Sequence, residues 1–166
     1  IGAGELGNGV AKIAHAFGMQ VIYAALPGHS HSCSMDRVAL DEFLVCADII
    51  SIHCPLTNKT RDLIGEDQFA RMKDSTIIIN CARGGIVNEA ALKQALIKGH
   101  IAGAATDVLT VEPPIDGNVL IDQAIPNLII TPHSAWVATE ARQRLIVQLA
   151  DNLRGFLDGK PRNQVL

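Results

Sequence analysis

The sequence has no run of lysine or arginine, no long apolar stretch and no closely spaced pair of cysteines. With a formal net charge of −3, the chain is poorly suited to a phosphate backbone, so nucleic acid is not an expected partner. No apolar run approaches the roughly 18 residues that span a bilayer. We therefore expect a soluble protein that has no membrane partner.

The four cysteines, Cys33, Cys46, Cys54 and Cys81, are widely spaced without a C-x-x-C pair. This spacing is typical of reduced thiols rather than of a disulfide framework, so we expect a cytoplasmic protein. The segment HSHSC at residues 29–33 alternates possible metal ligands. It lacks a fourth ligand at a recognisable spacing, so we interpret it as a solvated loop and predict no metal site.

The chain begins with IGAGELG, whose three glycines form the pattern G-x-G-x-x-G. In dinucleotide-binding βαβ units this pattern makes the phosphate-binding turn between a strand and a helix. An apolar helical face follows over residues 10–17, with a glycine at its end and a strand at residues 20–25. Only Ile1 remains of the strand that should precede the turn. We therefore expect a dinucleotide site whose first strand is truncated.

Helix and strand patterns alternate along the rest of the chain. Helices are expected at residues 39–47, 66–73 and 88–99, and each is followed by an apolar strand, at residues 48–54, 76–80 and 101–109. A further strand is expected at residues 127–132 and a long amphipathic helix at about 139–158. Strands alternating with helices predict an α/β fold of the Rossmann type, a doubly wound parallel sheet in three layers, with strands buried on both sides.

Polar side chains stand where the expected strands end, which is the edge where such sheets bind ligands. Arg83 precedes two glycines and could bind a small carboxylate through two hydrogen bonds. Asp107 could accept from a ligand amide. His133 follows a strand-ending proline and could exchange a proton with substrate, while Glu112 in the preceding loop could pair with it. Each residue also has a plain alternative as a surface, capping or turn side chain.

Five motifs occur in order: GAGELG, HCPLT, NCARGGIVNEAAL, ATDV followed by EPP, and TPHSAW. Over nearly its whole length the chain thereby resembles the D-isomer-specific 2-hydroxyacid dehydrogenases. PHSAW and the ending GKPRNQV are most similar to the hydroxypyruvate reductase or glycerate dehydrogenase branch. The resemblance implies an NAD(P)-dependent oxidoreductase that passes a hydride between nicotinamide and a small D-2-hydroxy acid or 2-keto acid, such as hydroxypyruvate, glyoxylate or glycerate.

The same resemblance implies roles for individual residues. His133 is then the general acid/base, Glu112 its carboxylate partner, and Arg83 the group that holds the substrate carboxylate and polarises its keto oxygen. The residues implied to bind the cofactor are Gly2, Gly4, Glu5, Leu6, Gly7, Cys54, Pro55, Thr60, Cys81, Ala82, Arg83, Asp107, His133 and Ala135. Among them, Asp107 would orient the nicotinamide carboxamide.

The expected selectivity residue is missing. NAD-selective sites place an acid about 20 residues beyond the glycines, to accept from the ribose 2′-hydroxyl. Ala25 or Leu26 occupies that place, and no arginine stands there for a 2′-phosphate. We expect either NAD or NADP to bind, with weak discrimination, unless an acid elsewhere or a shifted strand register supplies the contact.

Members of this family build the substrate pocket between two domains. We therefore expect residues 1–166 to be one dinucleotide-binding domain whose long final helix leads back toward an absent substrate domain. The chain alone should be catalytically poor, and the full-length protein should be a homodimer. The alternatives are a dinucleotide-sensing module like the family's corepressors, or a phosphoglycerate, D-lactate or formate dehydrogenase. Retention of His133, Glu112 and Arg83 together favours an enzyme, and Trp136 could wall the pocket or serve packing.

Overall fold

The computed structural model describes residues 1–27, 37–121 and 124–164. It forms two compact units, Ile1–Pro132 and His133–Leu166. The HSHSC segment at residues 29–33 lies outside the described residues. That a single dinucleotide-binding domain spans residues 1–166 stays a prediction.

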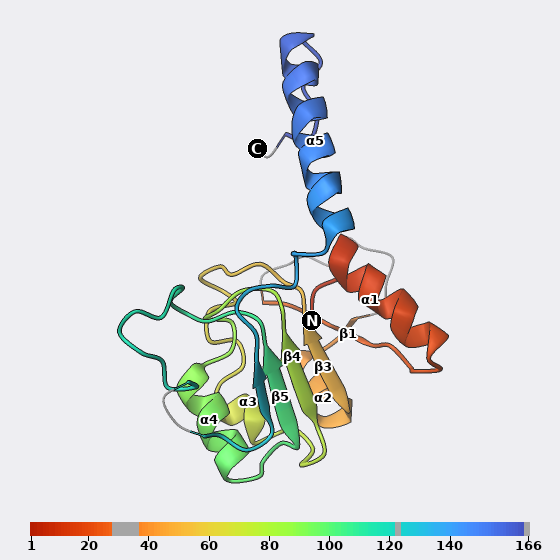
Figure 1. Cartoon of the computed structure of the whole chain (residues 1–166). Coiled ribbons are helices and arrows are strands. Elements are labelled where there is room, and N and C mark those ends of the chain that lie inside the picture. The colour runs from red at the N-terminus through yellow and green to blue at the C-terminus, as the bar shows by residue number, and fades with distance from the viewer. Residues whose placement is uncertain (28–36, 122–123, 165–166) are drawn as a thin grey trace. The chain divides into compact units, whose positions relative to one another are not determined.

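The first unit is an α/β fold on a four-stranded parallel sheet flanked by helices (Figure 1). Its strands, in their order across the sheet, are β3 (Ile49–Ile52), β4 (Ile77–Asn80), β5 (Gly103–Thr106) and β6 (Leu128–Ile130). The crossovers from β3 to β4 and from β4 to β5 carry α3 (Glu66–Phe69) and α4 (Glu89–Ile97). The predicted Rossmann-type fold class is thereby confirmed.

A second, two-stranded parallel sheet precedes it. It pairs β1 (Tyr23–Ala24) with β2 (Arg37–Val38), and the helices of this part are α1 (Glu5–Ala16) and α2 (Leu40–Cys46). Beyond β3 the larger sheet continues by one residue, because the Ile1 nitrogen donates to the Ser51 oxygen and the His53 nitrogen donates to the Ile1 oxygen, both at 2.7 Å. The two sheets share no strand. The sequence analysis missed β2, which is too short to show a strand pattern.

The expected burial of the strands on both sides is wrong for one face of the sheet. Ile50, Ile52 and Ile78 on the other face are at most 2% exposed, as expected for the core. Ile49 and Ile77, which pair with each other, are 46% and 41% exposed. Ile129 of β6 lies on the same face as these two residues and is 65% exposed.

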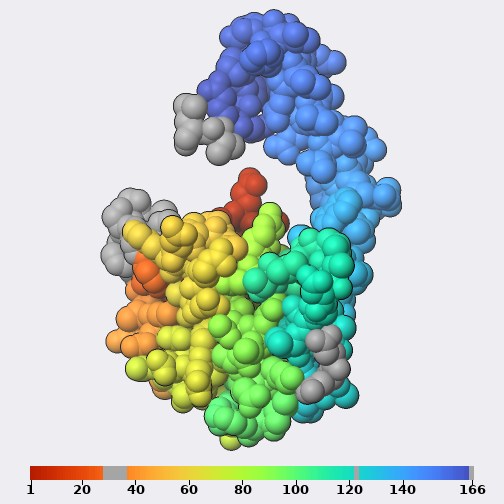
Figure 2. All heavy atoms as spheres, turned by 90° about the vertical axis from the view of Figure 1, so that its left-hand side faces the viewer, coloured from red at the N-terminus to blue at the C-terminus, as the bar shows by residue number. Residues whose placement is uncertain are grey.

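The core of the first unit lies between the sheet and its helices. Large, fully buried side chains come from Leu44 of α2, Phe69 of α3 and the isoleucines of the strands. Helices α3 and α4 pack against each other. Figure 2 shows α4, in green, beside the yellow segment that contains α3. This packing holds α4 in place beside α3.

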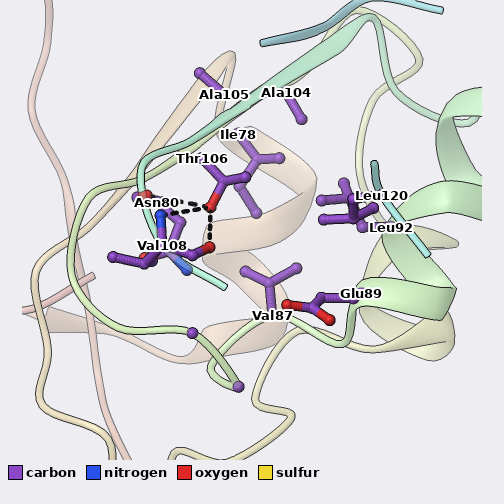
Figure 3. A pocket seen from close by; sticks show the side chains of 12 residues that line it. Ile78, Asn80, Val87, Glu89, Leu92, Ala104, Ala105, Thr106, Val108 and Leu120 are labelled. Carbon is purple, nitrogen blue, oxygen red and sulfur yellow. Dashed lines mark hydrogen bonds between the residues drawn. The ribbon is translucent and has the colours of Figure 1, made fainter. Parts of the chain in front are cut away.

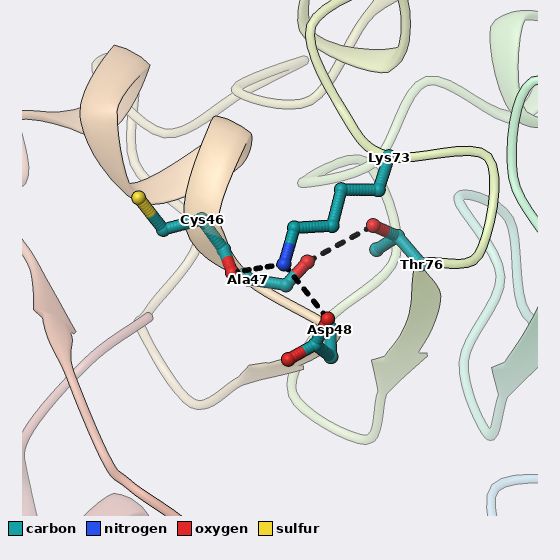
Figure 4. A network of polar contacts seen from close by, with 5 residues as sticks. All are labelled: Cys46, Ala47, Asp48, Lys73 and Thr76. Carbon is teal, nitrogen blue, oxygen red and sulfur yellow. Dashed lines mark hydrogen bonds and ion pairs between the residues drawn. The ribbon is translucent and has the colours of Figure 1, made fainter.

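A polar network joins the end of α2 to the starts of β3 and β4 (Figure 4). The Lys73 ammonium donates to the Cys46 oxygen at 2.7 Å and pairs with the Asp48 carboxylate at 2.8 Å. The buried Thr76 hydroxyl donates to the Ala47 oxygen at 3.0 Å. The hydrogen bond of Thr76 is buried, whereas the two contacts of Lys73 are exposed. Both kinds of contact connect the end of α2 to the starts of β3 and β4.

The second unit contains α5 (Thr139–Leu157), close to the predicted range. The chain after the helix returns along it, and the Asn163 amide donates to the Asn152 side-chain oxygen at 2.9 Å. The expected apolar stripe is present but exposed, since Leu149 is 54% and Phe156 is 72% exposed. Within the described part of the chain, no helix is long and apolar enough to cross a membrane.

Candidate functional site

The strand register gathers the strand ends in one row. Ile52, Asn80, Thr106 and Ile130 are partners across neighbouring strands. The residues that follow them, His53, Cys81, Asp107 and Thr131, therefore stand side by side at the carboxyl edge, and Gly2 extends the row beyond β3. Ligands of open parallel sheets bind at this edge. The row combines two titratable side chains and a thiol with the glycine turn.

In the glycine turn, two glycines leave no space for a side chain and one leaves free space. A Cβ at Gly2, whose φ is +99°, would lie 2.7 Å from the Cys54 nitrogen, and a Cβ at Gly7 would lie 2.1 Å from the Gly2 oxygen. No atom lies within 4 Å of a Cβ placed on Gly4. Because Gly4 also starts α1 without a side-chain cap, its helix terminus leaves backbone N–H groups for an anion. The turn thus fits the pyrophosphate of a dinucleotide.

The segment after β3 lies directly against this turn. The His53 ring is hydrogen-bonded to the Ser51 hydroxyl at 2.8 Å. Partial burial, with a smaller effect of the Ile1 ammonium, lowers the pKa of His53 below its usual 6.5. The Thr60 hydroxyl, expected at the cofactor, is buried and donates to the Pro55 oxygen at 2.7 Å. Thr60 therefore shapes the turn that carries Pro55.

The segment after β4 carries Cys81 and Arg83, both exposed at the edge. Asn80 fixes its shape, because its side-chain oxygen accepts from the Ala82 nitrogen at 3.0 Å and its amide donates to the Arg83 oxygen at 2.9 Å. The Arg83 guanidinium donates to the Ala82 oxygen at 2.7 Å. Partial burial and the nearby Asp107 raise the pKa of the Cys81 thiol. This thiol is consequently a weak nucleophile at neutral pH.

Asp107 is 4% exposed at the end of β5. Its backbone nitrogen donates to the Asn80 oxygen at 2.9 Å, and its carboxylate accepts a hydrogen bond from the Thr131 hydroxyl. A buried carboxylate held in this way can orient a neutral amide. The sequence analysis missed Thr131, although a hydroxyl directly after a strand at this edge was a usable sign.

Glu112 lies in the loop after β5, within the first unit. Its carboxylate accepts from the Leu109 nitrogen at 2.7 Å. His133 begins the second unit and has a φ of +51°, and its oxygen accepts from the Trp136 indole at 2.9 Å. The structure brings Arg83, Asp107 and Glu112 into one unit. The pairing of Glu112 with His133 stays a prediction, as do the roles of Ala135 and the other residues.

The remaining expected residues lie around these groups. Glu5 and Leu6 are exposed in the first turn of α1, and Cys54 is 2% exposed, with burial raising its pKa. Among the residues that the structure describes, no three histidine, cysteine or acidic side chains form a group that could hold a metal ion. The described cysteines Cys46, Cys54 and Cys81 are free thiols.

Comparisons with known proteins relate the chain to dehydrogenases and reductases. The glycerate dehydrogenase of Methylorubrum extorquens is 49% identical over 166 residues, 99% of this chain and 51% of that protein. The hydroxypyruvate reductase of Blautia hydrogenotrophica is 40% identical over 169 residues, again 99% of this chain and 51% of that protein. The chain spans about half the length of these relatives.

Solved structures show the same relationship. A D-lactate dehydrogenase with NAD+ from Lactobacillus jensenii matches 99% of this chain and 53% of its own, with a TM-score of 0.84 and 33% identity. An acyclic imino acid reductase in complex with NADPH and D-Arg matches 99% of this chain and 52% of its own, with a TM-score of 0.87 and 34% identity. The family model of the D-isomer specific 2-hydroxyacid dehydrogenase NAD binding domain matches residues 1–135, so the chain belongs to this family.

Proposed function

We propose that the full-length protein is a nicotinamide-dependent oxidoreductase that interconverts a small 2-keto acid and its D-2-hydroxy acid, with hydroxypyruvate, glyoxylate or glycerate as substrate. The observation that carries the proposal is the row at the carboxyl edge. In a chain of this family, it sets the end of β4, which carries Arg83, between the glycine turn and Asp107. Relatives named glycerate dehydrogenase and hydroxypyruvate reductase support the substrate class.

The chain's own residues divide the chemistry among them. When bound, the nicotinamide supplies or accepts the hydride. Gly4 and the start of α1 bind the pyrophosphate, and Asp107 orients the carboxamide. Arg83 binds the substrate carboxylate and draws electron density toward the keto oxygen. His133 donates the proton to that oxygen in reduction, with Glu112 as its proposed carboxylate partner.

We further propose that NAD and NADP are bound with little discrimination. Ala25 follows the last residue of β1, and its nitrogen donates to the Val38 oxygen at 2.8 Å. A methyl side chain at this position gives the 2′-hydroxyl no acceptor and the 2′-phosphate no cation. Solved relatives include complexes with either cofactor, which is in line with a family that accepts both.

His133→Ala in the full-length protein tests the proposed reaction. We expect turnover of hydroxypyruvate or glyoxylate to fall by about a hundredfold to ten-thousandfold, the usual contribution of a general acid. The dissociation constant of NADH should change little, because the pyrophosphate site lies in the first unit. Steady-state kinetics and a fluorescence titration measure the two quantities.

His100→Ala is the matched control, since His100 is exposed just after α4, away from the carboxyl edge. It should leave turnover and NADH binding unchanged. Wild-type turnover in His133→Ala would remove that residue from the role of acid. Tight NADH binding with no turnover of any small 2-keto acid by the unmutated protein would favour the dinucleotide-sensing module instead.

A further inference from the structure

Helix α4 contacts the loop that carries Glu112 through Glu89. Glu89, in the first turn of that helix, is half buried and lines a small pocket together with Thr106, Val108 and Leu120 (Figure 3). The pocket lies behind the carboxyl edge, between α4 and β5. Glu89 therefore lies near the segment that follows β4, with which it lines the pocket.

Both oxygens of the Glu89 carboxylate bind this loop. Oε1 accepts from the Thr110 backbone nitrogen at 2.6 Å, and Oε2 accepts from the Asn118 side-chain amide at 2.9 Å. Asn118 in turn accepts from the nitrogen of the buried Leu120 at 2.9 Å. The two contacts lie on either side of Glu112 in the chain, so Glu89 holds both limbs of the loop.

The contact with the first limb is close to Glu112 itself. The Leu109 nitrogen donates to the Glu112 carboxylate at 2.7 Å, and the next nitrogen along the chain, that of Thr110, donates to Glu89. Consecutive backbone amides thus hold the two carboxylates.

The same limb touches the segment that carries Arg83. A Cβ at Gly84 would lie 1.9 Å from the Leu109 oxygen, so the two backbones are in direct contact. Leu109 therefore contacts both the Glu112 carboxylate and Gly84, the neighbour of Arg83. A group that holds this limb of the loop also fixes the position of Glu112 relative to Arg83.

We infer that Glu89 is a positioning residue for the reaction: its carboxylate clamps the loop at Thr110 and Asn118 and thereby holds Glu112 and Arg83 in one arrangement. The inference rests on the proposed function, because it acts through the roles of those two residues. Because Glu89 acts through these residues, its effect should appear in turnover rather than in cofactor binding.

Glu89→Ala in the full-length protein should lower kcat for keto-acid reduction by about tenfold to a hundredfold, the range expected when catalytic groups are slightly misplaced. The dissociation constant of NADH should stay within about twofold of wild type, since the glycine turn is untouched. Glu89→Gln, which keeps one acceptor, should give a smaller loss of kcat and guards against a folding defect.

A double-mutant comparison separates positioning from plain stabilisation. If Glu89 acts through Glu112 as well as through the segment of Arg83, adding Glu89→Ala to Glu112→Gln should lower kcat further by clearly less than Glu89→Ala does alone. Glu42→Gln, an exposed acid in the first turn of α2, is the control and should match wild type. Full multiplication of the two losses, or a wild-type kcat in both Glu89 variants, overturns the inference.

The failure of each proposal has its own pattern. Loss of turnover in His133→Ala and Glu112→Gln, together with wild-type Glu89 variants, overturns only the positioning role. Wild-type turnover in Glu112→Gln overturns the assigned partner of His133 and with it the role of Glu89.

Discussion

Glycines of the same helix differ sharply in the space around them. A Cβ at Gly7 would lie 2.1 Å from the Gly2 oxygen, whereas nothing lies within 4 Å of a Cβ at Gly9. Gly7→Ala should therefore destabilise the protein by about 1–3 kcal/mol, as forced overpacking does. It should also weaken NADH binding, because the phosphate turn has to move. Denaturant unfolding and a fluorescence titration measure the two effects.

Gly9→Ala is the matched control. It should raise the free energy of unfolding by up to about 1 kcal/mol, since alanine is favoured over glycine inside a helix. NADH binding should stay as it is. Equal NADH affinity in Gly7→Ala and Gly9→Ala would show that the close contact of Gly7 does not shape the turn.

The sequence indicated candidate residues for the site but not what those residues touch. The glycines, Arg83 and Asp107 are candidates because each stands beside a strand with a clear pattern, and their roles stay predictions. Glu89 was missed, since its partners Thr110 and Asn118 lie 21 and 29 residues away. Contacts over such separations leave no periodicity in the sequence.

The starts of β3 and β4 are held by one buried hydrogen bond and by an exposed pair. Thr76→Val removes the buried donor and leaves the Ala47 oxygen without it, which should cost about 1–3 kcal/mol of unfolding free energy. Lys73→Met removes the exposed contact with Asp48 and should cost at most about 1 kcal/mol. Thermal or urea unfolding compares the two variants.

Salt separates the two contributions further. High salt should reduce the loss in Lys73→Met, because exposed ion pairs are screened, and should leave the loss in Thr76→Val nearly constant. A larger loss in Lys73→Met than in Thr76→Val would contradict the assignment of the main contribution to the buried bond.

Apart from β2, which was missed, helices and strands were predicted in the right order, yet most strands are shorter than expected. Periodicity marks the apolar residues of β3 and β4 but not the last hydrogen bond of each ladder. The apolar stripe of α5 was also predicted, whereas its exposure was not. A pattern shows which face of a helix is apolar, but what covers that face depends on other segments.

For the chain as a whole, the proposed lack of discrimination between NAD and NADP rests on the absence of an acidic or basic side chain at Ala25. NADH and NADPH should bind the full-length protein with similar dissociation constants, because Ala25 offers neither an acceptor nor a cation. A preference above 100-fold, about 2.7 kcal/mol, would contradict this expectation. Separate titrations that follow the nicotinamide fluorescence measure both constants.

Ala25→Asp provides the matched variant. The added carboxylate should accept from the ribose 2′-hydroxyl and repel a 2′-phosphate, so NADPH should lose affinity relative to NADH. An unchanged ratio in this variant would mean that a different part of the chain meets the ribose.

The sequence by itself determined the order of helices and strands apart from β2, the expected phosphate turn and the family, because these depend on local patterns and on motifs read along the chain. The tertiary structure decided which strand ends stand side by side and which carboxylate holds the loop of Glu112. Strand register and loop contacts join residues far apart in the chain, and such pairings are fixed only when the sheet and its helices pack together.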